Sequence, residues 1–156
     1  MIRMAIKETL CHVIKGDSLL LKRATRGISK GKWNGPGGKF NPGETPAQCA
    51  VRETLEETGL RMIDPFLHGK MYFYMNGSRR LDIDGYLFSA RKFSGRLKST
   101  EEGEVRWFKR QDLPFNEMWD DDKTWIDLML EGRRFNSYFY YGRGNARLKE
   151  CRIVLI

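Results

Sequence analysis

The sequence predicts an α+β fold in which a mixed or mainly antiparallel sheet lies between helices. Three observations support this class. Segments with the alternating or apolar patterns of strands dominate the chain, and only two segments have helical patterns. The 156 residues fit one domain, which we expect to span residues 1–156, and no internal repeat divides them.

The N-terminal region is expected to form two strands and a long loop. Residues 5–14 have the pattern of a strand, residues 16–18 that of a turn, and residues 19–21 begin a returning strand. Residues 25–43 are rich in Gly, Lys and Pro and are predicted to form one ordered loop. Because long loops in compact domains are often functional, we expect this loop to contribute to a site.

The clearest helix is expected between Thr45 and Gly59. Thr45 is a good N-cap, Pro46 occupies the first helical position, and Gln48 completes a capping box. Gly59 supplies the C-terminal stop. Five residues recur at helical spacing and are predicted to face the core: Ala47, Ala50, Val51, Thr54 and Thr58.

Most of the remaining chain is predicted to form strands. Residues 70–75 and 81–90 predict a hairpin that closes around Asn76-Gly77. A second helix is predicted from about Asp121 to about Arg133. The other predicted strands cover residues 104–109, 135–142 and 148–155.

The chain is basic, with 28 Lys and Arg against 20 Asp and Glu and a net charge of +8. A basic surface favours nucleotides, nucleic acids or anionic membranes, although it also serves simply to keep a protein soluble. The three cysteines show no paired spacing, so we expect neither disulfides nor a zinc site, and we expect a reducing, cytoplasmic setting. No segment has the pattern of a signal peptide or membrane span, so no membrane partner is expected.

Three glutamates on the first predicted helix form the strongest chemical signal. Glu53, Glu56 and Glu57 have the spacing i, i+3, i+4, which places them on one helix face. Such close like charges repel one another unless a cation lies between them, and carboxylate oxygens suit Mg²⁺ or Mn²⁺. Taken alone, this pattern is more often a solvated acidic face.

The neighbouring residues favour the metal hypothesis. Gly37-Gly38 lies upstream of the helix and allows close approach of backbone to a metal or phosphate. Arg52 lies within the glutamate cluster and can pair with a carboxylate to fix its orientation. Glu44 is expected to support the loop and helix, for instance by pairing with Arg52.

This segment resembles the Nudix box. The match runs through Gly38, Glu44, Arg52-Glu53, Glu56-Glu57 and Gly59-Leu60 at the spacing of that motif, and only Thr54 departs, where a bulky aliphatic is usual. The resemblance implies the Nudix fold, in which a mixed sheet is sandwiched between helices in an α/β/α arrangement. It also implies a nucleotide substrate.

The resemblance further implies metal-dependent hydrolysis at phosphorus. Glu53, Glu56 and Glu57 would hold Mg²⁺, with Mn²⁺ as a substitute and the Gly38 carbonyl as a further ligand. Glu56 is the first choice for the general base, and Arg52 completes the catalytic set. Outside the box, Glu102 or its neighbours Glu101 and Glu104 would supply a ligand or base, or would form a solvated acidic loop. Arg23 would contact phosphate, with an exposed edge arginine as the alternative.

Two further segments, KWNGPGGK and LPFNEMWDDDKTW, resemble the MutT-like enzymes that hydrolyse oxidised purine nucleoside triphosphates. Asp121, Asp122 and Asn34 would then hydrogen-bond the edge of a guanine-like base. Trp119 would stack on the base, and the pocket would be lined by Thr9, Phe73 and Met118, with Gly37 and Gly38 near the phosphates. The alternatives are that Asp120–Asp122 are N-terminal residues of the second helix, favoured by capping and by the helix dipole, and that Trp119 is a core residue.

The expected reaction converts a nucleoside triphosphate, such as 8-oxo-dGTP, to the monophosphate and pyrophosphate. Two alternatives remain at this point: a Nudix pyrophosphatase for another nucleotide (a normal dNTP, ADP-ribose or a dinucleoside polyphosphate), and a non-catalytic domain that binds nucleotide or RNA. We expect a monomer or homodimer with no obligate nucleic-acid partner.

Overall fold

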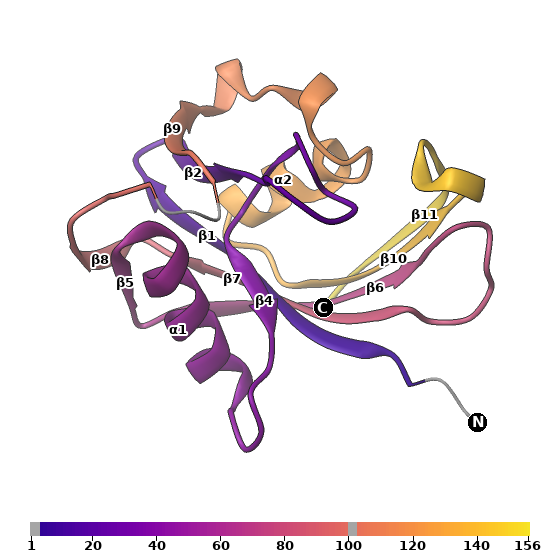
Figure 1. Cartoon of the computed structure of the whole chain (residues 1–156), viewed down its shortest axis with the longest axis horizontal. Helices are drawn as coiled ribbons and strands as arrows, with labels where there is room; N and C mark the ends of the chain where they lie inside the picture. Colours follow the sequence, from indigo (N-terminus) through magenta and orange to yellow (C-terminus); the bar gives the residue numbers. More distant parts are fainter. Residues whose placement is uncertain (1–3, 100–102) are drawn as a thin grey trace.

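A computed structural model describes residues 4–99 and 103–156, and a mixed sheet runs through their centre (Figure 1). Within these residues nine strands form one sheet, in the order β11-β10-β6-β7-β1-β2-β3, with β4 also pairing β1 and β9 also pairing β2. β1 runs parallel to β7 and β6 runs parallel to β10, whereas the other pairs are antiparallel. The strands of this sheet are β1 (Ile6–Lys15), β2 (Ser18–Arg23), β3 (Trp33–Asn34), β4 (Gly37–Lys39), β6 (Phe66–Tyr74), β7 (Ile83–Ala90), β9 (Val105–Lys109), β10 (Phe135–Tyr141) and β11 (Leu148–Leu155).

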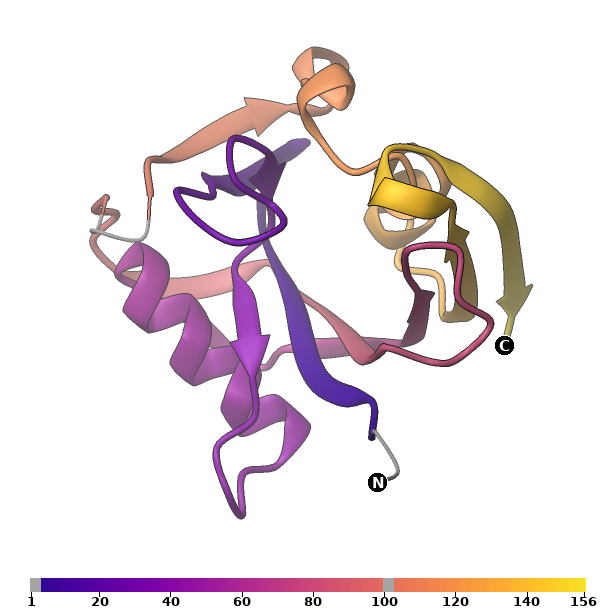
Figure 2. The same cartoon turned by 45° about the vertical axis from the view of Figure 1, so that its right-hand side comes forward.

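The remaining elements are two helices, three short 3-10 turns and a separate strand pair. They are α1 (Pro46–Thr58), α2 (Asp122–Leu130), η1 (Arg110–Asp112), η2 (Phe115–Glu117), η3 (Arg143–Asn145), β5 (Leu60–Ile63) and β8 (Lys92–Gly95). Figures 1 and 2 show α1 and α2 on opposite sides of the sheet. No helix among the described residues has the length and apolar content needed to cross a membrane.

The sheet buries apolar side chains on both faces, and each face is covered by one helix. On β2, Leu19 and Leu21 join a core cluster with Trp125 of α2, whereas Leu20 joins a second cluster with Ala50 of α1. This alternation follows from the two-residue period of a strand. The α+β prediction of a mixed sheet between helices is therefore confirmed.

The first helix begins and ends where the sequence predicts. The Thr45 side chain accepts from the Gln48 backbone N–H at 3.1 Å, and the Gln48 side chain accepts from the Thr45 N–H at 2.9 Å. Gly59 ends the helix in the left-handed conformation, with φ of 81°. One prediction for this helix is wrong: Ala47 is exposed, because the first turn follows an exposed loop (41–43) and burial begins at Cys49 and Ala50.

Several boundaries differ from the predicted ones. The segment predicted as a loop, 25–43, contains the short strands β3 and β4, and β5 and β8 were not predicted. β6 begins at Phe66 rather than at residue 70, and α2 ends at Leu130 rather than near Arg133. The β6–β7 hairpin is confirmed, and Asn76 and Gly77 both have positive φ, of 53° and 74°.

Candidate active site

A cavity of about 530 Å³ opens between the sheet, the C-terminal half of α1, the start of α2 and the loop after β2. It joins residues that are far apart in the sequence, because both the Nudix-box helix and the start of α2 reach its wall. Ten residues predicted for the site line it: Thr9, Asn34, Gly37, Gly38, Glu53, Glu57, Phe73, Trp119, Asp121 and Asp122. We call the wall at Glu53 and Glu57 the glutamate end, and the wall at Asp121 and Asp122 the aspartate end.

Glu57 is the buried acid of the glutamate end. Its carboxylate accepts the Gly37 N–H at 3.1 Å and pairs with Lys22 Nζ at 3.2 Å. Burial raises the pKa of Glu57 to about 7, and the Lys22 charge and the Gly37 N–H partly oppose that shift. Lys22 therefore supplies the positive charge nearest this carboxylate on the cavity wall.

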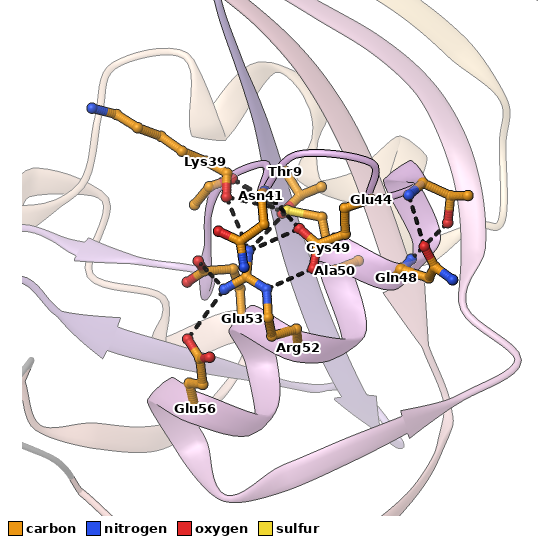
Figure 3. Close-up of polar contacts among 12 residues, drawn as sticks. Thr9, Lys39, Asn41, Glu44, Gln48, Cys49, Ala50, Arg52, Glu53 and Glu56 are labelled. Carbon is orange, nitrogen blue, oxygen red and sulfur yellow. Dashed lines mark hydrogen bonds and ion pairs between the residues drawn. The ribbon is translucent and has the colours of Figure 1, made fainter.

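Arg52 forms ion pairs with three acids: Glu53 and Glu56 on α1, and Glu44 just before it (Figure 3). Its Nε lies 2.6 Å from Glu44, and its Nη1 lies 2.8 Å from Glu53 and 3.2 Å from Glu56. Its Nη2 also donates to the Lys39 carbonyl at 3.0 Å. The Arg52 hydrogen bonds lower the pKa of Glu44 to about 2. The predicted pairing of Glu44 with Arg52 is confirmed, and this one guanidinium also orients two glutamates of the box.

Gly37 and Gly38 place the backbone of β4 close to the β1 backbone and to the Glu53 carboxylate. A Cβ on Gly38 would lie 2.8 Å from the Glu53 carboxylate. A Cβ on Gly37, where φ is 152°, would lie only 2.0 Å from the Thr9 carbonyl oxygen. Only glycine therefore fits at these positions without displacing β1 or Glu53.

The residues at the glutamate end fit a divalent cation. The carboxylates of Glu53, Glu56 and Glu57 and the Gly38 carbonyl are hard oxygen donors, which Mg²⁺ and Mn²⁺ prefer. Among residues 4–99 and 103–156, no three His, Cys, Asp or Glu side chains converge tightly enough to form a metal site, because Arg52 holds Glu53 and Glu56. Glu56 lies outside the cavity wall, with 55% of its side chain exposed.

Four residues predicted outside the box either point away from the cavity or fall outside the described residues. Arg23 points away from the cavity, bonding the Gly31 carbonyl at 3.3 Å and Glu117 at 3.4 Å. Because neighbouring side chains on a strand point to opposite faces, Lys22 lies on the cavity wall in its place. Glu104 is exposed and pairs with Arg106. Glu101 and Glu102 lie outside the described residues.

At the aspartate end, Asp121 is buried and its carboxylate is held by two aromatic residues. The Tyr141 hydroxyl donates to its Oδ1, and Trp125 Nε1 donates to its Oδ2 at 2.8 Å. Asp121 stands at the N-cap of α2, yet its side chain makes no capping hydrogen bond. The alternative that Asp121 serves as a helix cap is therefore wrong.

Asp122 is buried beside Asp121. Burial and the adjacent Asp121 carboxylate raise the pKa of Asp122 well above its ordinary value. Burial also raises the pKa of Asp121, although the hydrogen bonds from Tyr141 and Trp125 oppose that shift. Two buried acids in contact favour a shared proton.

The other predicted pocket residues divide between cavity and core. Trp119 lines the cavity, donates from Nε1 to the Ser29 hydroxyl at 2.9 Å and contacts Tyr141 edge-on. Phe73 lines the cavity and packs on Phe139. Met118 does not line it: this residue is buried in the core cluster under α2, so the prediction for Met118 is wrong.

Sequence reasoning missed Lys22 and Tyr141. The basic pair at the end of β2 signals a cation near the cavity, but the choice between Lys22 and Arg23 depends on strand register. Tyr141 lies 20 residues beyond Asp121 on β10, and nothing in the local sequence links the two.

Comparison with known proteins defines the class of this chain. The model of the NUDIX domain family matches residues 8–129, which is most of the chain. The chain therefore belongs to the Nudix hydrolase family.

Individual relatives are similar over nearly the whole chain. The chain is 39% identical to the oxidized purine nucleoside triphosphate hydrolase of Danio rerio and 37% identical to that of Mus musculus, in each case covering 85% of both chains. Among solved structures, a mutator MutT protein from Bacillus halodurans aligns with a TM-score of 0.84 at 27% identity, covering 95% of this chain and 97% of that one. These likenesses confirm the predicted Nudix fold and family.

Proposed function

We propose that the chain hydrolyses oxidised purine nucleoside triphosphates, such as 8-oxo-dGTP, to the monophosphate and pyrophosphate, and so removes damaged nucleotides from the pool. One observation carries the proposal: a single cavity is lined both by Glu53 and Glu57 of the Nudix box and by the buried Asp121–Asp122 pair. The names of the two animal relatives support the substrate class.

We propose Mg²⁺ as the metal, with Mn²⁺ as a substitute. Glu53, Glu56 and Glu57 would hold it together with the Gly38 carbonyl. When bound, such a cation neutralises phosphate oxygens and lowers the pKa of a coordinated water. Lys22 on the cavity wall adds a second positive charge for the phosphates.

The protein's own groups orient the water and take its proton. Glu56 is our choice for the base, because its Oε2 is fixed by Arg52 while its side chain remains more than half exposed to solvent. Its Oε1 would accept the proton of the attacking water. Arg52 is a positioning residue, since it contacts Glu44, Glu53 and Glu56 rather than the cavity.

The aspartate end would read the base. A protonated Asp122 can donate to a carbonyl oxygen of the base, while the Asp121 carboxylate accepts from a ring N–H. Asn34 both donates and accepts, and Trp119 offers a ring on which the base can stack, worth about 1–3 kcal/mol per base. Thr9 and Phe73 complete the lining of this half of the cavity.

We also propose a cell compartment and an oligomeric state for the protein. Cys11 and Cys49 are buried free thiols and Cys151 is an exposed one, which supports a reducing cytoplasmic setting. We propose a monomer or homodimer.

The test is a substrate panel with Mg²⁺: dGTP, 8-oxo-dGTP, 2-hydroxy-dATP, ADP-ribose and diadenosine tetraphosphate, with products identified by mass. We expect preferential conversion of an oxidised purine triphosphate to monophosphate plus pyrophosphate. Preference for another member of the panel would reject the base assignment but keep the metal helix. Absence of turnover despite bound metal would reject the enzyme and leave a binding domain.

A further inference from the structure

Four tyrosines and two arginines form an ordered surface that the hydrolytic site does not use. The tyrosines come from β6 and β10, one arginine from the β6–β7 loop and the other from β11. We call this surface the tyrosine–arginine face: Tyr72, Tyr74, Tyr138, Tyr140, Arg79 and Arg152.

These six side chains are arranged as two stacks across the strands. In the first, Tyr72 and Tyr138 stack with centroids 5.0 Å apart and planes 20° apart, and the Arg152 guanidinium lies 5.0 Å from the Tyr138 ring. In the second, Tyr74 and Tyr140 stack at 4.2 Å and 9°, and Arg79 lies 4.5 Å from the Tyr140 ring. Because the tyrosines are two residues apart on each strand, the stacks lie about 7 Å apart.

The tyrosine–arginine face lies on the side of the sheet away from the cavity. Phe73 lines the cavity and packs on Phe139, so its neighbours Tyr72 and Tyr74 must point to the opposite face. Among the described residues, α2 packs on the cavity side, and α1 packs on β1, β4, β5 and β7 rather than on β6 or β10. A hollow of about 350 Å³ lies on this face, lined by residues of both stacks together with Glu150 and Cys151.

Charge around the face is predominantly positive. The β6–β7 and β10–β11 loops are tied together, since Asn76 N–H donates to Asn145 at 2.6 Å and Gly144 N–H donates to Asn76 at 2.7 Å (Figure 2). The loops carry three more exposed cations: Arg80, Arg143 and Arg147. Arg79 pairs with Glu150 at 3.2 Å, but both side chains are more than 60% exposed, so water screens that pair.

We propose that the tyrosine–arginine face binds single-stranded nucleic acid. Guanidinium planes and tyrosine rings are surfaces on which unpaired bases stack, and the surrounding cations attract the phosphates. The outer face of each guanidinium remains available, because Arg79 is 71% exposed and Arg152 is also exposed. An acidic peptide would use the cations but not the stacks. This binding is separate from hydrolysis and is not required for it.

The test is fluorescence anisotropy of the full chain with a fluorescein-labelled oligothymidylate that has a 5′-hydroxyl end and so carries no triphosphate. We expect Arg79→Glu/Arg152→Glu to weaken binding about tenfold or more. Lys92→Glu/Lys109→Glu is the matched control: it makes the same change in net charge at exposed positions on β8 and β9. Arg79→Lys/Arg152→Lys keeps the charge but removes the planar groups, and we expect intermediate binding.

A second probe separates stacking from charge. An abasic oligomer with the same number of phosphates is expected to bind clearly more weakly than the oligothymidylate. Equal binding of the two oligomers, equal effects of the two Glu double variants, or equally tight binding of polyglutamate would overturn the proposal. Competition of the oligomer by nucleoside monophosphate would place binding in the cavity and overturn it as well. Concentration-dependent dimerisation that Arg79→Glu/Arg152→Glu abolishes would assign the face to a second copy of the chain instead.

Discussion

At the glutamate end of the cavity, Glu53 pairs with the charged Arg52 and Glu57 pairs with the charged Lys22. At the aspartate end, Asp121 is held by the neutral donors of Tyr141 and Trp125. A fixed cation favours ionised carboxylates, whereas burial among neutral donors favours a shared proton. The comparison shows that one cavity can surround its acids with cations at one end and with neutral hydrogen-bond donors at the other.

The largest expected effect comes from removing a charged ligand at the glutamate end. Glu53→Gln keeps the shape but loses the charge that faces Arg52 and the proposed metal. Since metal stabilisation of the transition state is worth several kcal/mol, we expect kcat to fall about a hundredfold or more. Steady-state kinetics with Mg²⁺ measure this, and Glu104→Gln, in an exposed pair with Arg106, serves as the control. Full activity of Glu53→Gln would contradict the proposal that the glutamate end binds the metal.

A smaller and selective effect is expected at the aspartate end. Asp122→Asn keeps an N–H donor but cannot share a proton with Asp121 as we propose for the aspartate end. A hydrogen bond involving a charged group contributes about 1.5–3 kcal/mol, so kcat/KM for 8-oxo-dGTP is expected to fall about tenfold to a hundredfold. The ratio of kcat/KM values for 8-oxo-dGTP and dGTP is the measurement. Equal losses on both nucleotides would mean that Asp122 does not read the oxidised base.

Tyr141→Phe tests whether the neutral hydrogen-bond donors hold the Asp121 side chain in place. The variant removes the hydroxyl that donates to Asp121 and that also accepts the Asp121 N–H at 3.0 Å. We expect the free energy of unfolding in urea to drop by about 1–3 kcal/mol, the cost of leaving a buried polar group without its partner. Tyr138→Phe, on the outer face, is the control for a lost hydroxyl. If both variants were equally stable, Tyr141 would not support Asp121.

The smallest expected effect is a pH-dependent change in stability that depends on His12. This residue is buried and contacts Gly35 and Trp125. Burial lowers the pKa of His12 to about 3, below the ordinary value of 6.5. The neutral imidazole therefore contributes full stability above pH 6.5, and that stability is lost as the pH falls toward 3, by at most about 1.4 kcal/mol per pH unit. Urea titrations at pH 7 and pH 5.5 should show a smaller loss for His12→Gln than for the unchanged chain. Identical losses would show that His12 does not control acid sensitivity.

The contrast between the two ends also explains what the sequence could predict. The glutamate end is local: Glu44, Arg52 and the box glutamates lie on one loop and helix, so their spacing alone indicates their pairing. The capping residues of α1 are local too, and that helix was predicted to within a residue. The NUDIX family match confirms the fold, whereas the catalytic and binding roles stay predictions.

The aspartate end depends on contacts that the chain makes only after folding. Tyr141 reaches Asp121 because β10 pairs with β6 beside α2, and Lys22 replaces Arg23 because of strand register. β5 and β8 escaped prediction because each has only four residues, and they are stabilised by pairing with each other. Ala47 has the correct period but lies in an exposed first turn, which periodicity does not detect.

The close packing at Gly37 limits which codon changes the protein can tolerate there. Gly37 contributes no side chain, yet a Cβ there would lie 2.0 Å from the Thr9 carbonyl oxygen. Every missense change of a glycine codon introduces a Cβ, so no single-nucleotide replacement offers a mild alternative at this position. Heritable variation at the Gly37 codon is therefore confined to synonymous changes wherever the activity is under selection.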